Sequence, residues 1–223
     1  MSAAHWEAFW PPIRLSLQVS LLASVIVLLL GLFAAWRMSR SAFPGKTLLE
    51  TAFLLPLVLP PTVVGFLLLV ALGRRSWIGR LAEALWQAPI VFSWGAAVIA
   101  SVVVAFPLVY QTLKTGFAAV DRDLEDAARS IGANEWQLFR YVTFPLIAHS
   151  FATAYILGFA RSLGEFGATL MIAGNIPGRT QTVPTAIYVA VDSGDTALAW
   201  AWTCAIVLIS FLMLLLARRN RPL

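Results

Sequence analysis

Two opposite charges stand four residues apart inside a long apolar stretch of the sequence. Arg161 and Glu165 lie within residues 149–172, where most other side chains are apolar or small. At this spacing on a helix the two side chains share a face, so the guanidinium and the carboxylate can form an ion pair. Ionisable groups in such stretches are costly and usually face other parts of the protein. The pattern allows two interpretations: an ion pair that holds helices together, or a polar station on the path of a charged solute.

The neighbours of the pair favour weak rather than tight binding of an anion. Arg161 could attract an anion, but Glu165 beside it neutralises the charge. Ser162 and Thr169 add hydroxyl groups that can make only weak polar contacts. A transport path suits this compromise, because a solute that binds strongly on the way cannot leave.

The sequence offers little for catalysis. Its two histidines and one cysteine are far apart, so neither a nucleophile–base pair nor a cluster of metal ligands is predicted. The phosphate-binding pattern GxxxxGK[ST] is absent, because Gly45 and Lys46 lack the upstream glycine and Arg occupies position 40. We therefore expect no catalytic residue, no metal site and no cofactor bound by this chain. Cys204 lies in an apolar run and is predicted to be a small core residue.

The composition indicates an integral membrane protein. Hydrophobic residues make up 60% of the 223 residues, charged residues make up 12%, and the mean hydropathy is +0.81. A soluble domain of this length would be far less apolar. We expect one all-α domain over residues 1–223, with an interfacial segment at residues 1–12. Five segments are long enough to cross a bilayer, namely 13–36, 48–72, 91–113, 149–172 and 196–217.

Three prolines interrupt the second of these segments. Pro56, Pro60 and Pro61 each lack the amide hydrogen that a helix needs for its hydrogen bonds. Within a bilayer, the carbonyl groups left free must face protein or a water-filled cavity. The prolines therefore predict either a packing kink or a bent helix that lines a translocation path.

The basic residues predict the orientation in the membrane. Ten lie in the two loops 37–47 and 114–148 and in the C-terminal tail: Arg37, Arg40, Lys46, Lys114, Arg122, Arg129, Arg140, Arg218, Arg219 and Arg221. Five lie on the other side: Arg14, Arg74, Arg75, Arg80 and Arg179. Because basic residues gather in cytoplasmic loops, we expect the C-terminus inside and the N-terminus outside.

The loop 114–148 is the longest segment between spans, and its first half predicts a short helix. Asp121 or Asp123 can cap the helix N-terminus, and Glu125 and Asp126 suit its positive end. A narrow apolar stripe follows helical spacing, formed by Leu124, Ala127, Ala128 and Ile131. The two alanines keep the stripe flat, so that a partner surface can approach closely.

The second half of the loop predicts a sharp turn and a second helix. Gly132 can adopt the positive φ that ends a helix, and Asn134 with Gln137 resembles a capping box. Pro145 fits the first turn of the following helix. The expected apolar face of the second helix consists of Trp136, Phe139 and Val142. Physical reasoning alone leaves open whether this hairpin lies on the membrane surface or contacts another protein.

The loop also resembles a motif of ABC importer permeases. That motif is Glu-Ala-Ala, three residues, Gly, nine residues and Ile-x-Leu-Pro. In this sequence, Asp126, Ala127, Ala128, Gly132 and Pro145 match it in register. Three positions depart conservatively, with Asp126 in place of Glu, Val142 in place of Ile and Phe144 in place of Leu. Further blocks resemble the permease subunits of molybdate importers: FPGK at 43–46, LPLVLPPTVVG at 55–65, GRR at 73–75, ARSLGEFGAT at 160–169, NIPG at 175–178 and TVP at 182–184.

The resemblance implies a fold, a function and partners. The fold would be that of type I importer permeases, in the cytoplasmic (inner) membrane of a bacterium. Two copies of the chain would assemble with two cytoplasmic ATPase subunits, which bind ATP and Mg²⁺, and an external binding protein would deliver the oxyanion. Glu125, Asp126, Ala127, Ala128, Gly132 and Pro145 would belong to the coupling helix region, which contacts the ATPase. The path or its gate would involve Pro56, Pro60, Pro61, Arg161, Ser162, Glu165 and Thr169.

Alternatives remain at this point. Sulfate permeases share the ARSLGEFGAT and NIPG blocks, and tungstate is nearly identical to molybdate in size and charge. A secondary transporter that uses Arg161 and Glu165 as an ion relay would work without an ATPase. Membrane lipid is an expected contact in every case, and no nucleic-acid partner is expected.

Overall fold

The computed structural model describes residues 3–219, and it describes side chains for residues 6–215. The described part of the chain is helical and contains no strand. In chain order the elements are α1 (Ala3–Arg40), α2 (Lys46–Val58), α3 (Pro61–Leu72), α4 (Trp77–Trp86), α5 (Trp94–Ala118), α6 (Arg122–Ser130), α7 (Glu135–Leu138), a π-helix (Phe139–Thr143), α8 (Phe144–Leu163), α9 (Gly167–Ala173), α10 (Val183–Asp192) and α11 (Thr196–Arg219). The predicted all-α class is confirmed.

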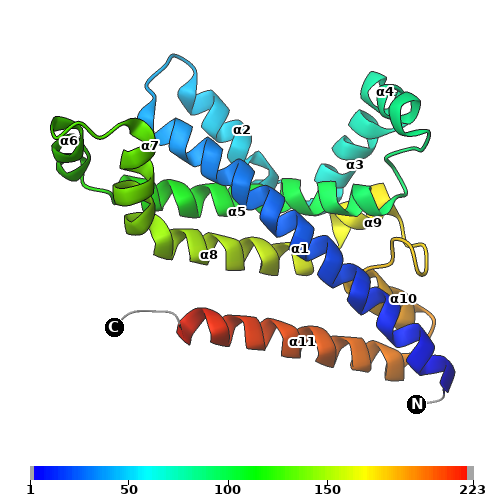
Figure 1. Cartoon of the computed structure of the whole chain (residues 1–223). Helices are drawn as coiled ribbons and strands as arrows, with labels where there is room; N and C mark the ends of the chain where they lie inside the picture. The colour runs from blue at the N-terminus through cyan, green and yellow to red at the C-terminus, as the bar shows by residue number, and fades with distance from the viewer. Residues whose placement is uncertain (1–2, 220–223) are drawn as a thin grey trace.

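Four long helices form the body of the molecule. α5, α8 and α11 run roughly side by side, and α1 crosses them at an angle (Figure 1). Within the described residues, four helices are long and apolar enough to cross a membrane, or up to five if the bent pair α2–α3 counts as one span. The predicted span at 48–72 is that pair, and its two halves are bent by 115°. The prolines therefore break the helix rather than merely kink it, because two of them, Pro60 and Pro61, are consecutive.

The first helix is longer than the predicted span. Residues 3–40 form one continuous helix that includes Pro11 and Pro12. At 1.5 Å per residue its 38 residues extend for about 57 Å. This length exceeds the hydrocarbon thickness of a bilayer, about 30 Å. The predicted interfacial segment is thus the first part of α1, and it is tied to α11 by a hydrogen bond from Trp202 Nε1 to the carbonyl oxygen of Phe9 (3.0 Å).

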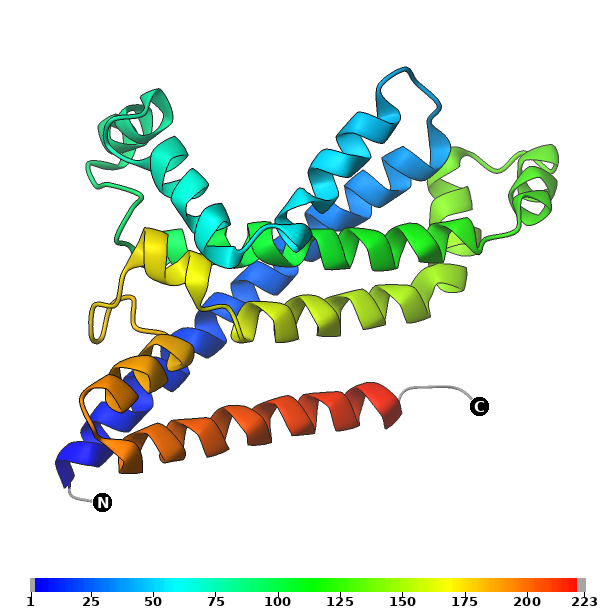
Figure 2. The ribbon, with the colours of Figure 1, turned by 180° about the vertical axis from the view of Figure 1, so that it is seen from behind.

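The core lies where α1, α5 and α8 meet. Its fully buried side chains include Val27 on α1, Val109 and Tyr110 on α5, and Ala154 on α8. In contrast, α11 leaves much of its surface exposed, and Figure 2 shows it separated from α8 over most of its length. Cys204 lies on α11 and is exposed, so the prediction of a core cysteine was wrong. An apolar side chain that faces lipid has the same hydropathy as one that faces protein.

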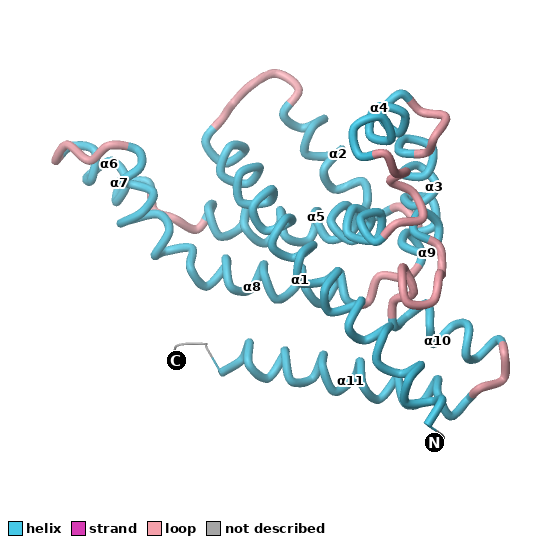
Figure 3. The backbone as a smooth tube through the Cα atoms, turned by 45° about the vertical axis from the view of Figure 1, so that its right-hand side comes forward, coloured by secondary structure: helices cyan, strands magenta, loops and turns pink. Residues whose placement is uncertain are grey.

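The connections lie mostly at two ends of the long helices (Figure 3). At one end, which we call the α6 end, are the 41–45 loop, α6 and α7. At the other, the α4 end, are the start of α1, α4 and the turn between α10 and α11 (Figure 1). The two predicted groups of basic residues therefore separate to opposite ends. Arg221 lies outside the described residues, as do the side chains of Arg218 and Arg219.

Candidate functional site

The hairpin at the α6 end has the local geometry that the sequence predicts. Asp121 caps α6 by accepting a hydrogen bond from the backbone N–H of Asp123 (2.9 Å). Gly132 ends the helix with φ +93°. Asn134 and Gln137 form a complete capping box, in which each side chain accepts a hydrogen bond from the other residue's backbone N–H at 2.9 Å. These features fix a sharp turn between α6 and α7.

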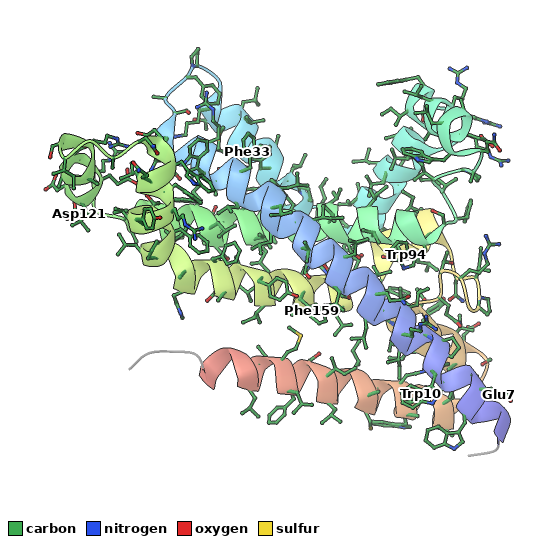
Figure 4. All side chains as sticks on the ribbon, viewed as in Figure 1. Glu7, Trp10, Phe33, Trp94, Asp121 and Phe159 are labelled. Carbon is green, nitrogen blue, oxygen red and sulfur yellow. The ribbon has the colours of Figure 1, made fainter. Side chains whose placement is uncertain are left out.

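The hairpin projects beyond the bundle and exposes its apolar stripe. α6 lies past the ends of α5 and α8, and Asp121 marks its start in Figure 4. No residue of α6 is buried. Leu124 is half exposed, and Ile131 is 87% exposed although it is a large apolar side chain. Because large apolar groups on a projecting helix are unfavourable in water, this surface is suited to a protein partner.

An arginine from α1 holds the hairpin in place. The guanidinium of Arg40 donates to Glu125 on α6 (Nη2–Oε1, 2.6 Å) and to Glu135 on α7 (Nη1–Oε2, 2.8 Å). The hydroxyl of Thr143 donates to the same Oε1 of Glu125 (2.7 Å). The side chain of Glu125 is only 13% exposed, so it faces inward and not toward a partner. The sequence did not identify Arg40 as part of the site, because its partners are 85 and 95 residues away.

A second arginine organises the outer side of the hairpin. Arg129 pairs with Asp126 (2.8 Å), Glu135 (2.9 Å) and, at a longer 3.7 Å, Glu125. Hydrogen bonds to Glu135 and then to Asp126 raise the pKa of Arg129 above its ordinary value. The alanines behave differently: Ala127 is exposed, while Ala128 is partly buried. The hairpin therefore carries ion pairs on its inner and its outer side, and the apolar stripe lies exposed beside the outer pairs.

The hairpin joins α8 without a break. Leu138 at the end of α7 is fully buried, and the π-helix leads directly into α8. Pro145 lies in the first turn of α8, as predicted. Because the backbone is helical from α7 through the π-helix into α8, a movement of the hairpin would also move α8.

The bundle contains two helix breaks, and they touch each other. One is at Leu59 and Pro60 between α2 and α3, and the other is at 164–166 between α8 and α9. A Cβ atom added to Gly65 on α3 would lie 2.8 Å from Cα of Ala168 on α9. One added to Gly167 would lie 3.0 Å from Cβ of Pro61. The glycines thus allow the two broken segments to pack backbone against backbone.

The charged pair forms, but not on one helix as predicted. α8 ends at Leu163, and Glu165 lies in the break. Nη1 of Arg161 is 2.8 Å from Oε2 of Glu165, whose Oε1 accepts a hydrogen bond from the backbone N–H of Ala168 (2.8 Å). The side chain of Glu165 is 1% exposed and that of Arg161 is 31% exposed. The carboxylate therefore serves both as the partner of Arg161 and as a cap for α9.

The predicted path residues fall into two separate groups. Ser162, Glu165 and Thr169 are buried within the chain and pack with Ser20 and Ser101 around a gap that is too small to hold a water molecule. Within the described residues, the hydroxyl groups of Ser20 and Ser162 have no hydrogen-bond partner. The second group lies at the surface, where Pro60 and Pro61 are exposed and Pro56 is partly exposed. Of the predicted path residues, the prolines and the partly exposed Arg161 therefore border space outside the chain.

Comparisons with known proteins agree with these features. Residues 27–222 match the family model described as "Binding-protein-dependent transport system inner membrane component". The Bacillus subtilis (strain 168) protein YvgM, whose name refers to a molybdenum transport system permease, is 57% identical over 99% of this chain and 97% of its own length. The molybdenum transport system permease protein ModB of Escherichia coli (strain K12) is 46% identical over 82% of this chain and 80% of its own length.

More distant proteins share the fold. The sulfate transport system permease protein CysW of Synechococcus elongatus is 36% identical over 88% of this chain and 68% of its own length. A chain in the structure of the MetNI methionine ABC transporter superposes with a TM-score of 0.75, at 13% identity, and covers 98% of this chain and 97% of that one. The latter likeness concerns the arrangement of helices alone.

Proposed function

The chain belongs to the family of binding-protein-dependent transport system inner membrane components, and from this premise we propose that it is the permease subunit of an ABC importer for molybdate. The observation that carries the proposal is the hairpin at the α6 end. Its sequence matches the coupling motif of importer permeases position by position, and its projecting helix exposes an apolar stripe. The 46% identity to ModB supports molybdate as the substrate.

The ATPase subunit docks on the α6 hairpin in this proposal. Ala127 and Ile131 are exposed there, and the small side chain of Ala127 lets a partner approach closely beside the protruding Ile131. Two such subunits bind ATP and Mg²⁺ and hydrolyse the nucleotide, while this chain binds no cofactor. Arg40 and the continuous connection into α8 transmit the movement of the hairpin to the membrane-spanning helices.

Two copies of the chain enclose the path between them. The break between α2 and α3 leaves backbone carbonyl groups without donors, because Pro56, Pro60 and Pro61 have no amide hydrogen. Such groups are not stable against lipid, so this face needs protein or water in front of it. A second copy related by a two-fold axis would provide both, with the path on the axis.

The two groups of basic residues support an orientation. The α6 end carries most of the loop arginines and lysines and is cytoplasmic in this proposal. The α4 end, where α1 begins, then faces outward and receives the oxyanion from an external binding protein. The chain would be a multi-pass protein of the bacterial cytoplasmic membrane with its N-terminus outside.

Uptake of radiolabelled molybdate tests the proposal. Cells that lack other molybdate routes would receive this permease, its ATPase and its binding protein together. We expect uptake that tungstate inhibits and that excess sulfate inhibits poorly. If the cells take up sulfate but not molybdate, the assigned substrate becomes sulfate. The likeness to CysW makes sulfate the second candidate. Uptake that continues without the ATPase would instead favour a secondary transporter.

A further inference from the structure

A groove runs along the outer face of α1 near the α4 end. Two adjoining hollows form it, one of 480 Å³ near Trp6 and Trp10 and one that is shallow and wide open and extends to Val25. Leu15 and Gln18 line both hollows, so the two are continuous. We call this feature the α1 groove.

The groove has a charged part and an apolar part. Arg14 lines the first hollow, and Arg179, from the loop between α9 and α10, lines the second. The floor beyond them is apolar and consists of Leu21, Leu22 and Val25. A charged entrance followed by an apolar trough matches an amphipathic ligand with an anionic head.

The two arginines lack anionic partners in the chain. Both side chains are exposed, and no carboxylate forms an ion pair with either of them in the described part of the structure. Glu7 also borders the first hollow, but it makes no ion pair with Arg14. Among the described residues, no titratable side chain other than Glu7, Arg14 and Arg179 lines the groove. A guanidinium that lies beside an apolar trough needs an anion or water at its tip.

The position along α1 sets the depth of each part. Arg14 and Arg37 are 23 residues apart, or about 35 Å on a helix. This distance corresponds to the hydrocarbon core of a bilayer with some tilt of the helix. Arg14 therefore lies at the level of the lipid head groups, and Leu21 to Val25 lie among the acyl chains. Trp10 and Trp94, seen at this end in Figure 4, match the aromatic residues of a membrane interface.

We infer that the α1 groove binds an anionic phospholipid of the outer leaflet. Its phosphodiester accepts hydrogen bonds from Arg14 and Arg179, and one acyl chain lies along Leu21, Leu22 and Val25. The leaflet rests on the orientation given under the proposed function, whereas the binding chemistry does not. A soluble binding protein does not reach this trough, because Val25 lies eleven residues, or about 16 Å, below Arg14.

Native mass spectrometry of the assembled transporter tests the inference. The complex of this chain with its ATPase would be delipidated in mild detergent and titrated with phosphatidylglycerol or, separately, with phosphatidylcholine of the same acyl chains. We expect tighter binding of phosphatidylglycerol, with a Kd about fivefold weaker after Arg14→Gln and again about fivefold weaker after Arg179→Gln. Arg80→Gln removes an exposed arginine of α4 outside the groove and should leave the Kd unchanged.

A second pair of variants tests the trough without altering charge. Leu22→Trp should fill the apolar hollow and weaken phosphatidylglycerol binding, whereas Leu29→Trp, on the exposed surface of α1 beyond the hollow, should not. Soluble glycerol phosphate should fail to compete, which separates a lipid from a free phosphate.

Several results would overturn the inference. They are equal binding of the two lipids, equal effects of Arg80→Gln and Arg179→Gln, equal effects of Leu22→Trp and Leu29→Trp, or competition by glycerol phosphate. None of these measurements uses substrate uptake. Their failure would therefore leave the importer assignment intact.

Discussion

Arg40 joins the last turn of α1 to two helices of the α6 hairpin. Its hydrogen bonds to Glu125 and Glu135 are the direct polar link between α1 and the hairpin among the described side chains. Pairs of this kind matter more when one partner is largely buried, as Glu125 is. Arg40 is therefore positioned to couple docking of a partner on α6 to movement of α1.

Arg40→Gln should uncouple ATP hydrolysis from transport. We expect a loss of about 1 to 2 kcal/mol in stability, between the values for exposed and buried ion pairs. ATPase activity of the reconstituted complex should persist, while the amount of substrate carried per ATP falls. Arg122→Gln is a matched control, because Arg122 and Arg40 line the same cavity beside α6 but Arg122 makes no ion pair in the described structure. Equal transport per ATP in the Arg40 variant and the control would remove Arg40 from the mechanism.

Arg161 and Glu165 should depend on each other. Arg161→Met leaves a buried carboxylate without its cation, at a cost of about 3 kcal/mol. Glu165→Gln keeps an acceptor for the N–H of Ala168 and should cost less. The double variant should be more stable than the sum of the two losses predicts. Melting temperatures of the purified variants measure this interaction, and strictly additive losses would show that the pair has none.

At the scale of the element, the turn after α6 depends on one backbone angle. Gly132 has φ +93°, and no atom lies within 4 Å of the position that a Cβ atom would take. A substitution there would therefore strain the backbone but would not cause a steric clash. Gly132→Val should cost about 1 to 2 kcal/mol in the turn and abolish stimulation of the ATPase. Gly132→Asn should retain most of the stimulation, because asparagine tolerates a positive φ. If the valine variant transports normally, the turn is not required for coupling.

The contact between α3 and α9 depends on the absence of a side chain. In Gly65→Ala the new Cβ would lie 2.7 Å from Cβ of Met171 and 2.8 Å from Cα of Ala168, so the two helix breaks must move apart. We expect a destabilisation of about 1 to 3 kcal/mol and reduced transport. Gly164→Ala is the control, because its Cβ would meet the carbonyl oxygen of Ala160 at an ordinary 3.7 Å. Comparable melting temperatures for the two variants would contradict the close packing.

At the scale of the whole molecule, the broken pair α2–α3 should face a second copy of the chain. Val58, next to the break, is 81% exposed. In a Cys204→Ser background, Val58→Cys should form a disulfide-linked dimer on oxidation, because residues near a two-fold axis meet their own copies. Phe33→Cys, on the exposed face of α1, should remain monomeric on a denaturing gel. Cross-linking at position 33 and not at 58 would assign the interface to α1.

The sequence predicted the features whose signals are local. Asp121, Gly132 and the pair Asn134–Gln137 each act within a few residues, and all of them have the predicted geometry. The end of α8 was missed although Gly164 and Gly167 surround Glu165. These glycines also suit close packing within a continuous span, so their presence alone did not distinguish the two structures.

Long-range features could not be obtained in the same way. Arg40 looks like any basic residue at the end of a span, and only the folded chain brings it to Glu125. The contact of the two helix breaks joins residues about 100 positions apart. The hydropathy of α11 could not show that Cys204 is exposed and not in the core, because the residues around it are apolar on every side of the helix.

The exposed stripe of the α6 hairpin also has a consequence for the life of the protein in the cell. Before assembly, Leu124, Ile131 and Trp136 present large apolar surface to the aqueous side of the membrane. Such surface is what chaperones and membrane proteases recognise. A chain made in excess of its ATPase should therefore have a short half-life, and synthesis of the ATPase should set how much of the permease accumulates.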